Sequence, residues 1–156
     1  MQTDSTMIEM DTQNDTCAAL NNALAETALA TMLAQNFHWN VTGMHFAPLH
    51  HLFQEIYEDH FQAQDDLAER IKALDGYADG NLRRMRERST IEEGTGNENA
   101  HQMLSALLKA EETLASSLKS CGALAATHGD TLTEDLCIAR GQVHEKFAWF
   151  LRSHLR

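Results

Sequence analysis

The sequence predicts an all-α protein built as a four-helix bundle, and three observations indicate this class. Leucine and alanine are strong helix formers and number 19 and 21, whereas β-branched valine and isoleucine number only two and five. The 156 residues include a single proline, the residue that interrupts helices. Apolar residues also recur at helical spacing in four long segments, which together are enough to bury one continuous core.

The first helix is expected over residues 15–41. Asp15 or Thr16 can cap its start, because both side chains accept hydrogen bonds from the first free backbone N–H groups. Gly43 supplies the left-handed residue that commonly follows a helix. The apolar face consists of two neighbouring rows, Leu20, Leu24, Ala28 and Met32 beside Leu29, Leu33 and Phe37.

The second helix is expected to start at Pro48, because proline is favoured in the first turn, and to end at Gly76. Its apolar positions alternate in steps of three and four, as in helical bundles. These positions are Leu49, Leu52, Phe53, Ile56, Tyr57, His60, Phe61, Leu67, Ile71 and Leu74.

Two further helices are expected over residues 99–127 and 132–154, with Gly129 between them. The apolar positions of the third are Met103, Leu107, Ala110, Leu114, Leu118, Cys121 and Ala125. Those of the fourth are Leu132, Leu136, Ala139, Val143, Phe147 and Phe150.

The connections predict how these helices are joined. Residues 43–47 and 128–131 are short links, so each joins two antiparallel neighbours. The link over residues 77–98 is long and contains LRRMRER, which favours a short extra helix. Two helical hairpins joined by one long crossover are typical of the ferritin-like topology. We therefore expect one ferritin-like domain over residues 15–156, preceded by a flexible acidic tail over residues 1–14.

Charge and cysteine content narrow the classes of partner. The formal net charge is −11, and residues 1–69 hold eleven acids and no lysine or arginine, so the chain should attract cations and repel nucleic acid. No apolar run of about 20 residues predicts a membrane span. The N-terminus has neither the basic nor the apolar region of a secretory signal. Three cysteines without CxxC spacing indicate a reducing compartment, and we expect a cytoplasmic protein.

Nine histidines among many carboxylates make metal binding the first chemistry to consider, because imidazole and carboxylate together suit iron, manganese or zinc. On a helical wheel His50, Gln54, Asp65 and Glu69 share one stripe of the second helix. His50 lies roughly 22 and 28 Å along the axis from the two acids, too far for one ion. An antiparallel two-fold mate would bring them together. The alternative is a solvated, charged helix face.

A ferritin-type centre inside one bundle is disfavoured, because it requires ExxH motifs on two helices. The chain has one ExxH, Glu98 to His101, where a favourable interaction with a helix N-terminus explains the acid equally well.

Residues 37–76 resemble the core signature of the Dps family (DNA-binding proteins from starved cells). The matching residues are His38-Trp39, His50, Asp65 and Ala68-Glu69-Arg70, and residues 143–155 resemble the last helix of the family. The resemblance implies a homo-oligomeric, dodecameric shell built from two-fold dimers. It implies a ferroxidase that oxidises Fe(II), preferentially with hydrogen peroxide, and stores iron against oxidative stress. His38 and His50 of one subunit would bind two irons with Asp65 and Glu69 of its mate.

One departure concerns an acid that the family has four residues after the second histidine. Gln54 stands there, and because a neutral amide is a poorer ligand for ferrous iron, we expect one metal position to be weak. Trp39 beside the first ligand would either intercept oxidising equivalents or fill a dimer interface.

Two more features have alternative explanations. Asp130 and Asp135 resemble family acids that line an iron-entry pore, but they also suit helix capping and the helix dipole. The basic cluster Arg83, Arg84, Arg86 and Arg88 is the only candidate for DNA contact, while residues 1–16 hold four acids and no base. We expect weak or absent DNA binding. The alternative functions are a DNA-compacting stress protein with incidental metal binding, and a structural zinc or manganese oligomer.

Overall fold

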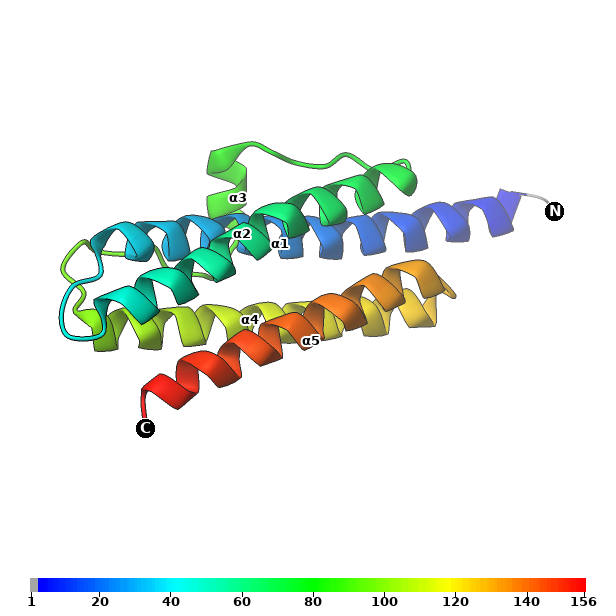
Figure 1. Ribbon diagram of the computed structural model, residues 1–156. Coiled ribbons are helices and arrows are strands. Elements are labelled where there is room, and N and C mark those ends of the chain that lie inside the picture. Colours follow the sequence, from blue (N-terminus) through cyan, green and yellow to red (C-terminus); the bar gives the residue numbers. More distant parts are fainter. Residues whose placement is uncertain (1–2) are drawn as a thin grey trace.

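The computed structural model describes the backbone of residues 3–156 and the side chains of residues 13–156, and this part of the chain contains helices and no strand. Four long helices lie side by side as a bundle and a short fifth crosses the outside (Figure 1). Within the described residues, no helix is long and apolar enough to cross a membrane. The predicted all-α bundle is confirmed, and the helices are α1 (Thr3–Asn40), α2 (Phe46–Ala73), α3 (Leu82–Arg88), α4 (Ala100–Thr127) and α5 (Thr131–His154).

The connections follow the prediction. Gly43, with φ of 108°, separates α1 from α2, and Gly129, with φ of 72°, separates α4 from α5, so both glycines adopt the left-handed region that suits them. The long crossover carries α3, which packs against α1. Each hairpin packs along its length, and α1 also packs on α4, whereas α2 and α5 touch at few points. The backbones of α2 and α5 therefore approach each other less closely than those of the other neighbouring long helices.

Helix α1 begins at Thr3, well before the expected start at Asp15. No glycine or proline occurs in residues 3–14, so nothing in the sequence stops the helix from continuing toward the N-terminus. The Gln13 side-chain amide donates to the Leu74 carbonyl at the end of α2, a contact made from within the expected tail. The flexibility of residues 1–14 stays a prediction.

The core forms two apolar clusters, one at each end of the bundle. The first surrounds Phe37 and Phe53, which are fully buried, and includes Leu107 of α4. The second surrounds Leu20 and Leu67. All seven apolar positions expected on the third predicted helix are buried in α4, so its core face was predicted correctly: Met103, Leu107, Ala110, Leu114, Leu118, Cys121 and Ala125.

The core face of α5 differs from the prediction by about one residue of rotation, or roughly 100°. Leu132 was expected in the core and is 69% exposed. On α2, Phe61 was also expected in the core and is 73% exposed. The rotation brings Arg140 and His144 inward, which an apolar pattern cannot anticipate. Of the expected positions only Phe147 is buried. The buried face consists of Thr133, Cys137, Arg140, His144, Phe147, Ala148 and Leu151.

Candidate metal centres

His38 and His50 face each other at the closed end of the α1–α2 hairpin. Their rings stack with centroids 3.7 Å apart and planes 17° apart. His38 Nδ1 lies 2.7 Å from the backbone carbonyl of His50, and His50 Nδ1 lies 2.7 Å from the carbonyl of His38. The two predicted ligands of the first half-site are therefore adjacent.

These reciprocal bonds determine which ring nitrogen is available. A carbonyl only accepts, so each Nδ1 must carry the proton that it donates. In the neutral imidazole the lone pair then resides on Nε2, the arrangement that typically supports a metal-binding histidine. Tyr57 meets His38 edge-on at 5.2 Å, and Phe46 stacks on His50 at 5.0 Å. The aromatic neighbours hold both rings in orientation.

Asp65 and Glu69 lie exposed on the same helix, many turns away from His50. At 1.5 Å per residue the separations from His50 are roughly 22 and 28 Å, as the sequence predicted. The structure thus brings the two histidines together and leaves the two acids apart from them within one chain. Completing the expected site requires a second copy.

Two neighbours of this half-site have roles that the sequence left open. Gln54 donates to the Glu58 carboxylate at 2.7 Å, so its amide is already engaged along α2. Trp39 follows His38 and is 61% exposed. Its indole is on the surface of the described chain, where a neighbouring subunit can cover it.

Asp130 caps the N-terminus of α5, which was one of its two predicted roles. Its carboxylate accepts from the Thr133 backbone N–H at 3.0 Å and pairs with Arg70 at 2.8 Å. Partial burial acts to raise its pKa, but the Thr133 hydrogen bonds and the Arg70 charge outweigh this and lower the pKa. Asp135 is exposed, so it is the more available carboxylate for a pore.

Glu98, the acid of the single ExxH motif, already has hydrogen-bond partners in the structure. Glu98 precedes α4 and accepts from the Thr95 backbone and hydroxyl and from the Gly96 backbone, which lowers its pKa to about 2. It stabilises a turn, and the cap of α4 is Asn99, whose side chain forms a capping box with Gln102.

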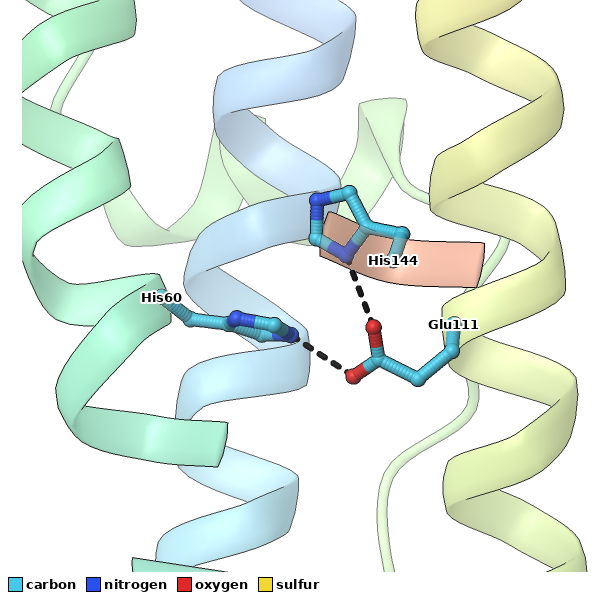
Figure 2. A group of neighbouring side chains, drawn as sticks. All are labelled: His60, Glu111 and His144. Atoms are coloured by element: carbon cyan, nitrogen blue, oxygen red, sulfur yellow. Dashed lines mark hydrogen bonds and ion pairs between the residues drawn. The ribbon is translucent and has the colours of Figure 1, made fainter. Parts of the chain in front are cut away.

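A second group of metal-type side chains lies inside the bundle. His60 from α2, Glu111 from α4 and His144 from α5 converge on one point (Figure 2). His60 Nε2 lies 2.7 Å from Glu111 Oε1, and His144 Nδ1 lies 2.7 Å from Glu111 Oε2. All three side chains are fully buried. Among the described residues this is the group in which three such ligands come together.

Asp59 and Arg140 extend this cluster toward the α2–α5 seam. His60 Nδ1 faces Asp59 at 3.1 Å, and Arg140 reaches Asp59 at 2.7 Å and His144 Nε2 at 3.3 Å. The five side chains close a ring of hydrogen bonds. Because His60 meets carboxylates on both nitrogens, it carries two protons, whereas His144 accepts from Arg140 and is neutral.

The pKa directions agree with this assignment. Burial opposes the cation at His60, but the Glu111 and Asp59 carboxylates raise its pKa to about 9. Burial likewise opposes ionisation of Glu111, and the His60 charge lowers the Glu111 pKa nonetheless. Burial lowers the pKa of His144. Two positive and two negative groups leave the ring neutral, which is how a core tolerates them.

Sequence reasoning missed this cluster. His60 was counted among the apolar positions, a centre inside the bundle was disfavoured because the chain has one ExxH motif where two are required, and neither Glu111 nor His144 was singled out. A partial signal was present: His60 and Glu111 lie three or four residues from apolar positions expected in the cores of their helices, whereas His144 lies beside the face expected for its helix. Because a buried ionisable side chain needs a partner, two such residues on core faces predict that they pair.

The chain is similar to known proteins in both sequence and structure. Residues 17–156 match the ferritin-like domain family. The chain is 34% identical over 136 residues to the DNA protection during starvation protein 2 of Bacillus anthracis, covering 87% of this chain and 93% of that protein. The Dps of Staphylococcus aureus is similar in structure, with a TM-score of 0.90, 33% identity, and coverage of 92% and 97%. A Vibrio cholerae Dps protein, described as a member of a broad superfamily of ferritin-like diiron-carboxylate proteins, gives a TM-score of 0.90 at 29% identity, with coverage of 94% and 92%.

Proposed function

Because the chain belongs to the Dps family of ferritin-like proteins, we propose that it is a ferroxidase that oxidises Fe(II) and stores the ferric product, and so protects against oxidative stress. The enzyme is a hollow homo-oligomer, a dodecamer assembled from two-fold dimers. Its sites are shared, with His38 and His50 from one subunit and Asp65 and Glu69 from the mate.

The observation that carries this proposal is the His38–His50 pair. Two imidazoles with their Nδ1 protons committed to backbone carbonyls present two Nε2 lone pairs at one end of a hairpin. They have no carboxylate partner of their own chain among the described contacts, while Asp65 and Glu69 are exposed farther along α2. An antiparallel copy of α2 supplies carboxylates to the histidine pair and imidazoles to the two acids.

The proposed reaction couples two ferrous ions to one peroxide. Each Fe(II) gives up one electron, and hydrogen peroxide accepts both and takes two protons to form two molecules of water. Imidazole and carboxylate ligands suit both oxidation states, and the acids stabilise the greater charge of the ferric product. With the neutral Gln54 amide engaged by Glu58, the second iron position is the weaker one.

Removing single ligands tests the reaction, and the chain offers a matched control beside each. His50→Ala and Asp65→Asn should each lower the rate of ferric absorbance growth at least about tenfold, because both remove a direct metal ligand. His51→Ala and Asp66→Asn change exposed neighbours and should leave the rate within about twofold of the parent. Equal losses in a variant and its control would contradict the assignment. Absence of peroxide-driven oxidation by the parent would favour the structural zinc or manganese oligomer.

Mixing the two inactive variants tests whether the site is shared. When His50→Ala and Asp65→Asn chains are co-expressed and assemble at random, half of the dimers combine one of each. One of the two sites in such a dimer is then complete, so about a quarter of all sites should recover activity. A site made within one chain predicts no recovery, and that result would remove the shared-site proposal.

Gln54→Asp tests the weak second position. A carboxylate in place of the amide should raise the affinity for the second ferrous ion, because a hard cation prefers an anionic oxygen ligand. Titration of apo protein with Fe(II) under anaerobic conditions should then show one weak binding step of the parent replaced by a tighter one. Unchanged titration curves would contradict the role given to Gln54.

The alternative function is DNA compaction, and the basic cluster argues against it. Arg84 and Arg88 share the Asp79 carboxylate, and Arg86 pairs with Glu93, so these two acids offset half of the positive charge of the cluster. We propose weak or absent DNA binding at neutral pH. Retention of duplex DNA in a low-salt gel shift, lost on adding salt, would favour the alternative.

We also propose a cytoplasmic location. Cys17, Cys121 and Cys137 are all buried and none forms a disulfide. Free thiols agree with a reducing compartment.

A further inference from the structure

We propose that His60, Glu111 and His144 form a second metal site, inside the bundle of each subunit, which binds one divalent transition-metal ion of the zinc or ferrous type. Two imidazole nitrogens and one carboxylate are a ligand set that both ions accept. The site is separate from the shared half-sites, because it is complete within one chain and draws on α2, α4 and α5.

The spacing of the ligand atoms favours an ion. The three candidate atoms lie within 4.8 Å of one another, and the two nitrogen-to-oxygen distances are both 2.7 Å. Around an ion with bonds of about 2.0–2.1 Å, neighbouring ligand atoms stand roughly 3 Å apart. The carboxylate therefore needs to separate from each ring by a few tenths of an ångström, and the two ring nitrogens, which lie within 4.8 Å of each other, must come within about 4.2 Å, twice the bond length.

The surroundings of His60 already match those of a metal-binding histidine. Its other nitrogen, Nδ1, faces the Asp59 carboxylate at 3.1 Å, and Arg140 holds that carboxylate with contacts of 3.1 and 2.7 Å. A carboxylate behind the ring keeps the proton on Nδ1 and directs the Nε2 lone pair at the ion. The Asp59 side chain is 29% exposed, so this end of the network meets solvent.

Binding exchanges one proton for the divalent ion, so the ring gains one net positive charge. The ion replaces the proton on His60 Nε2, which leaves to solvent, and the His144 proton moves from Nδ1 to Nε2. His144 Nε2 then no longer accepts from Arg140, a contact of 3.3 Å that is the longest in the ring. Arg140 keeps both of its bonds to Asp59.

Cobalt binding in solution tests the site without relying on activity. The full-length protein carrying His50→Ala, which disables the shared half-site, is stripped with chelator and titrated with Co²⁺. We expect one ion per chain, with the visible absorption of cobalt bound to nitrogen ligands. Adding His144→Gln should weaken this binding at least tenfold, because the amide keeps a hydrogen bond to Glu111 but offers no imidazole. His154→Gln, an exposed change on the same helix, should leave the binding unchanged.

A crystal of the unaltered protein soaked in Co²⁺ keeps the test decisive if His144→Gln does not fold. Anomalous density between the three side chains would support the site. Density at other sites with none at this one, or a cobalt stoichiometry that His144→Gln leaves unchanged, would overturn the proposal and leave a purely hydrogen-bonded network.

Discussion

Replacing Glu111 with glutamine should destabilise the metal-free protein far more than the same change one residue later. Glu111 is fully buried and accepts from two fully buried rings at 2.7 Å. Removing one member of a buried charge pair costs about 3–5 kcal/mol, and because glutamine retains the size and one acceptor, we expect the lower end, about 3 kcal/mol. Glu112 is the matched control: it is 56% exposed and lies 3.3 Å from Arg152, itself 43% exposed. Exposed pairs of this kind contribute roughly 0–1 kcal/mol.

Thermal unfolding in the presence of chelator measures the difference. For a chain of this size, 1 kcal/mol shifts Tm by about 2–4 °C, so Glu111→Gln should lower Tm by about 6–12 °C. Glu112→Gln should lower it by no more than about 4 °C. All samples need one protein concentration and one particle size, because assembly also stabilises the fold. If the two variants unfold within about 2 °C of each other, the buried ring contributes little and the reasoning from burial is refuted.

Three further predictions concern the remainder of the fold. Gly76→Ala should lower the free energy of unfolding in urea by about 1–3 kcal/mol, because its new methyl group would lie 2.6 Å from a buried cysteine sulfur. In Gly80→Ala the methyl group meets no other atom, so the stability should not change. Asp79→Asn should lower the urea midpoint at pH 7. Its arginine partners hold the pKa of this carboxyl at about 2, below the ordinary 3.8, so its contribution is present above pH 3.8 and is lost as the pH falls through about 2. The midpoint difference from the parent must therefore shrink below pH 4; a constant difference would contradict this. Asp130→Ala should cost about 1 kcal/mol as a lost cap, while Asp135→Ala should slow iron uptake with unchanged Tm; the reverse pattern would exchange their roles.

Most of the architecture was predictable because it depends on local chemistry. Gly43 and Gly129 end helices, Pro48 lies in a first turn, and LRRMRER forms the short α3, all as expected. Each of these depends on a few neighbouring residues, so the sequence contains the necessary information.

What failed depends on contacts across the bundle. The core face of α5 was misplaced because Arg140 and His144 are polar by type, and only Asp59 and Glu111 on other helices make their burial tolerable. The start of α1 was misplaced because a capping residue such as Asp15 is compatible with a helix interior. His50 was located by its spacing on α2, and its pairing with His38 was implied by the Dps resemblance, but the match of this half-site to Asp65 and Glu69 involves a second chain and stays a prediction.

The neutrality of the buried ring has a consequence for how the molecule responds to its medium. Since the four charges of the ring cancel, the acidic excess of the chain lies outside the ring, mostly on side chains that meet solvent, where mobile counterions screen it within about 10 Å at 0.1 M salt. Ionic strength should therefore change how fast cations reach the protein and how closely neighbouring particles approach, while the bundle beneath remains almost indifferent to it.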